Sequence, residues 1–195
     1  LEEAYAHTDI DQMIIDEEAS TVYLADADMS LDVGAIAKGY ATEKVADMLE
    51  GQGISHVLLD IGGNIRAIGD KPDGTLWRLG LQNPDLDSDE NYVHIIELES
   101  TSLVTSGDYQ RYYTVNGKRY HHIIDPQTLM PSDRFTDVSV IYEDSGISDA
   151  MATALFNMDI EEGKALAESV GAEVLWIFQD GSETMTDGFA DYISE

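Results

Sequence analysis

The segment Ser148-Asp149-Ala150-Met151-Ala152-Thr153 contains residue types that bind hard metal ions. Asp149 and Thr153 are four residues apart, so on a helix their carboxylate and hydroxyl lie on one face. Two hard oxygens on one face suit Mg²⁺ or Ca²⁺ far better than a soft metal. Ser148 is the expected N-cap, which places Asp149 in the first helical turn. The alternative interpretation is an acidic helix start followed by a buried threonine.

A second segment, Leu31 to Tyr40, places the carboxylate of Asp32, a glycine turn and a helix start close together. Backbone N–H groups at such a helix start are free to bind a ligand. Lys38 lies near the positive end of the helix dipole, where a cation is disfavoured unless an anion is nearby. A phosphate here would accept hydrogen bonds from both the amides and Lys38. The alternative is a helix entry with a solvated lysine.

Two more segments carry polar groups that suit a ligand site, Thr105-Ser106-Gly107-Asp108-Tyr109 and His121-His122-Ile123-Ile124-Asp125-Pro126. Adjacent side chains on a strand point to opposite faces, so one site would use only one of the two histidines. A histidine at a strand end beside an aspartate is a reasonable general base near neutral pH. A metal ligand and a structural histidine are the alternatives. Three of the ten basic residues lie between the two segments, namely Arg111, Lys118 and Arg119. This local enrichment indicates either an anionic ligand or a solvated hairpin.

Short strands and a few helices must position these groups. The apolar spacing predicts helices at 35–49, 149–158 and 161–170. Strands are expected at 13–16, 21–24, 57–61, 65–68, 76–81, 93–98, 102–105, 112–115, 118–120, 138–142, 173–178 and 183–186. Asn116-Gly117 predicts a tight hairpin, and Gly62-Gly63-Asn64 a turn or bulge that a ligand can approach closely. Strands outnumber helices without regular alternation, which favours an α+β fold with mixed or antiparallel sheets.

Composition excludes several classes of function. The 195 residues include 39 acidic and 10 basic side chains, giving a net charge of −29, which disfavours binding to nucleic acid. The 43% apolar content is enough for a folded core, and no apolar stretch is long enough to cross a bilayer. The absence of cysteine excludes disulfides, thiolate metal sites and a cysteine nucleophile. Because the chain begins at Leu1-Glu2-Glu3, we expect it to be part of a longer protein.

In this order, the segments resemble the ApbE family, the FAD:protein FMN transferases. The resemblance runs from about Asp11 to the C-terminus, and it favours the ligand-binding interpretation of the first two segments. It is carried by Asp32–Tyr40, with its IAKGY stretch, and by Gly62–Asn64, Thr105–Tyr109, His122–Pro126 and Ser148–Thr153. Family members extend upstream, so residues 1–195 are expected to form the C-terminal major portion of an ApbE-like domain.

The resemblance also implies roles for individual residues. Mg²⁺ would be held by the main-chain oxygen of Ala35, the Asp149 carboxylate and the Thr153 hydroxyl. FAD would be bound by Asp32, Lys38, Ser106, Gly107 and Ile124, and His122 would be the catalytic base. In the implied reaction a threonine of an acceptor protein attacks the FMN phosphorus of FAD, AMP leaves, and FMN stays on the protein as a phosphoester. The chain departs from the family at Leu129, where glycine is usual and the turn is therefore expected to differ, and at Ala152, where relatives are expected to carry a polar or acidic group.

Three other functions are compatible with these residues. A Mg²⁺-dependent FAD pyrophosphatase would use water in place of the threonine and release FMN and AMP. A non-catalytic flavin-binding lipoprotein would hold FAD unchanged, and an acidic Ca²⁺-binding module would not respond to FAD. The resemblance further implies an acceptor of the redox-pump or FMN-binding-domain type. It also implies an exported protein at the extracytoplasmic face of a bacterium, attached to the membrane only through a lipid anchor outside this chain.

Overall fold

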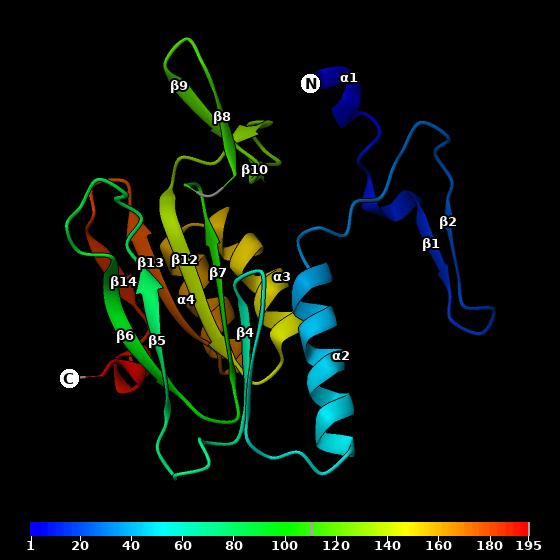
Figure 1. Cartoon of the computed structure of the whole chain (residues 1–195). Coiled ribbons are helices and arrows are strands. Elements are labelled where there is room, and N and C mark those ends of the chain that lie inside the picture. Colours follow the sequence, from blue (N-terminus) through cyan, green and yellow to red (C-terminus); the bar gives the residue numbers. More distant parts are fainter. Residues whose placement is uncertain (110, 195) are drawn as a thin grey trace.

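The computed structural model describes residues 1–109 and 111–194, and its central element is a six-stranded sheet (Figure 1). Each pair of neighbouring strands in this sheet is antiparallel. The strands in spatial order are β14 (Glu183–Met185), β13 (Glu173–Phe178), β12 (Phe135–Tyr142), β7 (Ser102–Gly107), β4 (Asn64–Ile68) and β3 (Val57–Ile61). The α+β architecture with antiparallel sheets is the one predicted from the sequence.

Three helices cover one face of this sheet. α2 (Ala37–Gly51) packs on β3 and β4, α3 (Ser145–Phe156) on β7 and β12, and α4 (Ile160–Val170) on β13. The core beneath them is apolar and includes Val104, Val138, Val140, Leu155, Phe156 and Trp176. Burial of this face stabilises the helices more than their intrinsic propensities do.

The opposite face of the sheet packs against a separate hairpin, formed by β5 (Trp77–Gln82) and β6 (Tyr92–Leu98), and against the short helix η2 (Phe189–Tyr192). Leu103 and Ile141 belong to this second core, whereas their strand neighbours Val104 and Val140 belong to the first. This alternation follows from the two-residue period of a strand. The sheet is therefore the middle layer of three.

Smaller elements extend beyond these layers (Figure 1). The hairpin of β1 (Met13–Asp16) and β2 (Thr21–Leu24) stands away from the sheet, next to α1 (Glu2–Tyr5) and η1 (Ile10–Gln12). The β8–β9 hairpin (Tyr112–Val115 and Lys118–His121) turns at Asn116-Gly117, as predicted, and is followed by β10 (Ile124–Asp125) and β11 (Met130–Pro131). None of the helices in the described part of the chain combines the length and apolarity needed to cross a membrane.

The predicted N-cap of α3 was wrong. The helix begins at Ser145 rather than at Asp149, and its N-cap is Asp144, whose Oδ1 accepts a hydrogen bond of 2.9 Å from the Ile147 amide. The backbone of Asp144 is extended and its carboxylate reaches the third helical residue, which is the usual N-cap geometry. Ser148 lies inside the helix, so Asp149 belongs to the second turn and not the first.

Leu129, where the resemblance leads us to expect a different turn, lies between β10 and β11. Leu129 has a φ of 59°, in the left-handed region that glycine adopts without steric cost. Its amide donates a hydrogen bond of 2.8 Å to the carbonyl of Asp125, which closes the turn. The turn therefore has a glycine-type backbone with a leucine in it.

Candidate functional site

A cavity of about 470 Å³ lies where the start of α2, the middle of α3, the end of β7 and the segment after β9 meet. Its wall contains all nine residues predicted to hold metal, flavin or a proton: Asp32, Ala35, Lys38, Ser106, Gly107, His122, Ile124, Asp149 and Thr153. These residues come from segments that are far apart in the chain. The structure brings every predicted residue together, while the individual roles stay predictions.

Asp149 is the most buried charged group of this cavity, with 3% of its surface exposed. Its Oδ2 accepts a hydrogen bond of 2.9 Å from the Gly39 amide, and its Oδ1 lies 3.3 Å from Nζ of Lys38. A Cβ on Gly39 would lie 2.2 Å from the Ser145 carbonyl oxygen, so only glycine permits this approach of α2 to α3. The close crossing of the two helices is what brings Asp149 to the start of α2.

Ala35 lies just before α2, whose N-cap is Ile36. The first bond of the helix runs from the N–H of Tyr40 to the carbonyl of Ile36, so the N–H of Gly39 is one of the donors at the helix start that has no acceptor within the helix. Here the same N–H donates to Asp149 instead. Ala35 lines the same cavity as Asp149 and Thr153.

This set of donors fits a hard divalent cation. One carbonyl, one carboxylate and one hydroxyl are oxygen ligands of the kind that Mg²⁺ prefers, with water completing its shell. Ala152 is fully buried in the core and supplies no further ligand. The Lys38 ammonium lies beside the same carboxylate.

Lys38 and Asp32 shape the side of the cavity at the helix start. Oδ1 of Asp32 accepts a hydrogen bond of 2.6 Å from the Gly34 amide, which fixes the turn before α2. The side chain of Lys38 is 45% exposed and passes close to Gly62, where a Cβ would lie 3.6 Å from its Cδ. An ammonium at the N-terminal end of a helix is well placed for a phosphate, because the helix amides attract the same anion.

His122 has the geometry of a general base. Its Nδ1 lies 3.3 Å from the carbonyl oxygen of Arg111, and because a carbonyl only accepts, Nδ1 is the donor. The neutral ring then has its lone pair on Nε2. Partial burial lowers the pKa of His122, and the charges of Arg111 and Lys38 lower it further, against the opposing effect of the Arg111 carbonyl. The uncharged, proton-accepting form is therefore favoured near neutral pH.

The neighbouring His121 points away from the cavity. Its ring is buried, and Nε2 lies 2.7 Å from the Ser132 carbonyl oxygen. Strand alternation predicts this division between a structural and a site histidine.

Five residues of the cavity wall were not among the predicted site residues: Gly34, Gly62, Thr105, Arg111 and Ile123. The local enrichment in basic residues pointed to Arg111 but could not separate it from Lys118 and Arg119. In the structure those two cations lie over tyrosine rings of their own hairpin, Lys118 over Tyr120 at 5.4 Å and Arg119 over Tyr112 at 4.7 Å. Only Arg111 of the three lines the candidate site.

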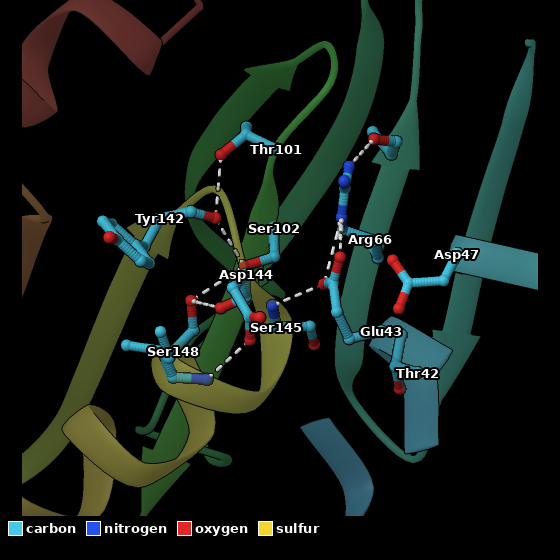
Figure 2. Close-up of polar contacts among 12 residues, drawn as sticks. Thr42, Glu43, Asp47, Arg66, Thr101, Ser102, Tyr142, Asp144, Ser145 and Ser148 are labelled. Carbon is cyan, nitrogen blue, oxygen red and sulfur yellow. Dashed lines mark hydrogen bonds and ion pairs between the residues drawn. The ribbon is translucent and has the colours of Figure 1, made fainter. Parts of the chain in front are cut away.

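A second buried carboxylate, Glu43 on α2, also connects the two helices (Figure 2). Glu43 is 8% exposed, accepts a hydrogen bond of 2.7 Å from the Ser145 amide, and pairs with Nε of Arg66 on β4 at 3.2 Å. Each helix start thus receives a carboxylate from the other helix, α2 from Asp149 and α3 from Glu43. This reciprocal capping fixes the α3 side chains relative to Ala35. Nothing in the local sequence distinguishes Glu43 from a solvated acid, so it was missed.

The described residues contain one further cluster of potential metal ligands, well outside this cavity. His7, Asp26 and Asp28 place one ligand atom each within 4.8 Å of one another near the surface. His7 Nδ1 is 2.7 Å from Oδ2 of Asp26, so these two side chains already form a hydrogen bond with each other. Their mutual hydrogen bond raises the pKa of His7.

Comparison with known proteins gives one consistent result. A family model described as the ApbE family matches residues 1–176. A FAD:protein FMN transferase of Klebsiella pneumoniae (strain 342) is 39% identical over 155 residues, covering 79% of this chain and 47% of the relative. One from Vibrio cholerae is 37% identical over 190 residues, covering 97% of this chain and 54% of the relative.

Solved structures agree with the sequence relatives. The ApbE protein of Thermotoga maritima superposes with a TM-score of 0.90 at 31% identity, over 100% of this chain and 63% of that one. The flavin transferase ApbE of Vibrio cholerae superposes with a TM-score of 0.82 at 34% identity, over 98% of this chain and 62% of that one. The chain spans about half the length of the curated relatives it matches.

Proposed function

Because the chain belongs to the ApbE family, we propose that it works as a Mg²⁺-dependent FAD:protein FMN transferase. The observation that carries this proposal is the gathering of all nine predicted residues in one cavity. Relatives that share 37–39% of its residues are named for this activity. The proposed substrates are FAD and an acceptor protein that presents a threonine.

Binding of FAD would rest on the positive side of the cavity. Lys38 and Arg111 both line it, in a chain whose net charge of −29 otherwise repels a nucleotide. The amides at the start of α2 add hydrogen-bond donors for a diphosphate. Mg²⁺, when held by Ala35, Asp149 and Thr153, would supply further charge stabilisation for the phosphoryl oxygens.

The chemical step needs a base and a stabilised leaving group. Nε2 of His122 would accept the proton of the acceptor threonine hydroxyl as its oxygen forms a bond to the FMN phosphorus. The bond between that phosphorus and the bridging oxygen of FAD breaks at the same time, and AMP leaves with the bridging oxygen. Lys38, which lines the same cavity, would neutralise part of the charge that develops on the leaving phosphate.

A transfer assay tests the proposal directly. The chain would be incubated with FAD, Mg²⁺ and a flavin-acceptor domain, with a parallel reaction in EDTA, and the acceptor analysed by intact mass. We expect the acceptor to gain the mass of one FMN less one water, as formation of the phosphoester requires, only when Mg²⁺ is present. Free FMN and AMP without labelled acceptor would instead show the pyrophosphatase, and FAD that stays unchanged would show a flavin-binding protein.

His122 offers a sharper version of the same test. His122→Ala is expected to slow the transfer much more than it weakens FAD binding, because the base acts on the proton and not on the ground-state complex. An equal loss in both measurements would contradict its role as base.

Export and a lipid anchor stay predictions from the family resemblance.

A further inference from the structure

A chain of hydrogen-bonded side chains runs from the wall of the cavity into the protein. Oγ1 of Thr105 lies 2.8 Å from Oγ of Ser139, and Ser139 donates a hydrogen bond of 2.9 Å to Oδ1 of Asp137. The hydroxyl of Tyr109 donates to Oδ2 of Asp137, also at 2.9 Å. Asp137 and Ser139 are 0% exposed. The relay, as we call Thr105, Ser139 and Asp137, thus connects a cavity residue to a carboxyl group without access to water.

Strand register explains why these groups meet. Ser139 lies opposite Thr105, and Asp137 opposite Gly107, in the pairing of β12 with β7. Residues two apart share one face of a strand, so all four positions face the β5–β6 side of the sheet. A Cβ on Gly107 would lie 2.5 Å from the Tyr109 ring. The absent side chain of Gly107 therefore makes room for Tyr109 to reach Asp137.

Thr105 is placed between two cavities. Together with Gly62 it lines both the candidate site and a neighbouring cavity of about 490 Å³ on the β5–β6 side, which Tyr92 and Tyr109 also line. A ligand that fills the candidate site and extends past Gly62 would meet the hydroxyl of Thr105 at this junction.

The number of protons in the relay decides what Thr105 offers to such a ligand. Each hydroxyl has one proton to donate. When Asp137 is ionised it only accepts, so Ser139 donates to Asp137 and Thr105 donates to Ser139. Thr105 then presents only lone pairs to the ligand. When Asp137 is protonated it can donate to Ser139, Ser139 can donate to Thr105, and the Thr105 proton is free for the ligand.

We propose that Asp137, acting through Ser139, is a positioning residue that sets whether Thr105 presents a hydrogen-bond donor or an acceptor to the ligand. The choice of ligand rests on the proposed function. Phosphate oxygens and flavin carbonyls of FAD accept hydrogen bonds, so FAD pairs with the donor state of Thr105. FAD and a proton on Asp137 therefore favour each other's binding.

Both states are accessible near neutral pH. Burial raises the pKa of Asp137 to about 7, against the hydrogen bonds from Tyr109 and Ser139, which favour the ionised form. The carboxylates that face it, Asp108 after β7 and Glu183 on β14, raise the pKa further. A carboxyl with this pKa changes its protonation in the range where the proposed reaction would run.

Measurement of FAD affinity against pH, with Mg²⁺ constant, tests the relay. For the wild-type chain we expect the affinity to fall about tenfold between pH 6 and pH 8, as the donor on Thr105 is lost. In Asp137→Asn the side-chain amide donates permanently to Ser139, so the affinity should stay at its pH 6 value. Ser139→Ala and Thr105→Val should both abolish this fall in FAD affinity between pH 6 and pH 8, which we call the step. Thr105→Val should also bind FAD weakly at pH 6.

Thr136→Val is the matched control for Thr105→Val. Thr136 lies on β12, but its hydroxyl bonds the Phe178 carbonyl instead of the relay, so the variant should retain the wild-type step. A step of the same size in Asp137→Asn as in the wild type would overturn the proposal, because the step would then arise from another group.

A ligand-free measurement separates this proposal from the proposed function. Carbon-13 NMR should show the Asp137 carboxyl titrating near neutral pH, and Ser139→Ala should raise its pKa by removing a donor to the ionised form. A carboxyl that keeps one charge state between pH 5 and pH 9 would overturn the relay even if FAD binds. Failure to bind FAD at any pH, with the carboxyl titrating as expected, would instead contradict the proposed function.

Discussion

The amide of Gly39 donates a hydrogen bond of 2.9 Å to Oδ2 of Asp149, so the start of α2 is capped by a carboxylate from α3. Asp149 therefore has a structural task besides the metal-binding role predicted for it. Its burial makes this task demanding, because a buried N–H without an acceptor loses its hydrogen bond to water as well.

Two substitutions at Asp149 separate these tasks. Asp149→Asn keeps an acceptor for the Gly39 amide, so the free energy of unfolding should change by less than about 1 kcal/mol, while loss of the charge should weaken Mg²⁺ binding at least tenfold. Asp149→Ala removes the acceptor as well and should destabilise the fold by about 1–3 kcal/mol. Calorimetric Mg²⁺ titration and urea unfolding give the two readings. Unchanged Mg²⁺ affinity in Asp149→Asn would contradict the metal assignment.

The close crossing of α2 and α3 predicts a severe effect at Gly39. A Cβ there would lie 2.2 Å from the Ser145 carbonyl oxygen and 2.6 Å from Cβ of Asp149, both on the facing helix. Gly39→Ala should force the helices apart and destabilise the fold by about 2–4 kcal/mol. Gly51→Ala is the matched control, since a Cβ at Gly51 meets nothing within 4 Å, and it should be neutral or slightly stabilising. Equal unfolding midpoints for the two variants would show that the helices are not tightly packed.

Much of the candidate site could be predicted because its chemistry lies in short segments with distinctive residue types. Asp149 and Thr153 share a helix face at a spacing readable from sequence, and Lys38 lies at a predicted helix start. Strand alternation likewise predicted that only one of His121 and His122 would face the site.

The support of the site could not be predicted, because it depends on pairings between distant residues. Glu43 and Ser145 are 102 positions apart, and neither has a local signal for the hydrogen bond they form. The N-cap of α3 was misplaced for a different reason. The pair Ser145-Gly146 is not typical of a helix, and Ser148 has the residue type of an N-cap, so the sequence favoured Ser148. In the structure Asp144 has the extended backbone that an N-cap requires.

The left-handed turn at Leu129 gives an unusual ranking of substitutions. At an ordinary position alanine is more stable than glycine by about 0.5–1 kcal/mol. With a φ of 59° at Leu129 the order should reverse, because only glycine avoids the steric cost of this region. We expect Leu129→Gly to be more stable than Leu129→Ala by about 1 kcal/mol in thermal or urea unfolding. Both variants lose the contacts that Leu129 makes beyond Cβ, so a lower stability for Leu129→Gly would mean that the turn relaxes to a right-handed backbone.

The lowered pKa of His122 predicts where the proposed activity declines in acid. A base must be uncharged, so the rate should fall as the pH drops through the pKa of His122, and the midpoint should lie below the ordinary value of 6.5. Arg111→Gln removes a charge that lowers this pKa, so the midpoint should move upward. Values of kcat/KM for flavin transfer measured against pH give both midpoints, because kcat/KM reports the pKa of the free protein. A midpoint above 6.5 in the wild type would contradict the assignment of His122 as the base.

The buried carboxyl of Asp137 predicts how stability depends on pH. Its pKa is about 7 in the folded protein and near the ordinary value of 3.8 when the chain is unfolded, so the folded state binds the proton more tightly. The stabilisation from this proton is complete below pH 3.8, declines by about 1.4 kcal/mol per pH unit above it, and is lost once the pH passes about 7.

Comparison with Asp137→Asn isolates this contribution, because every other acidic residue of the chain is shared by the two proteins. The free energy of unfolding of the variant, relative to the wild type, should therefore rise between pH 4 and pH 7 and stay level above pH 7. Urea unfolding at a series of pH values provides the curve. A constant difference would mean that Asp137 keeps an ordinary pKa in the folded state, and the two protonation states of the relay would then not interchange near neutral pH.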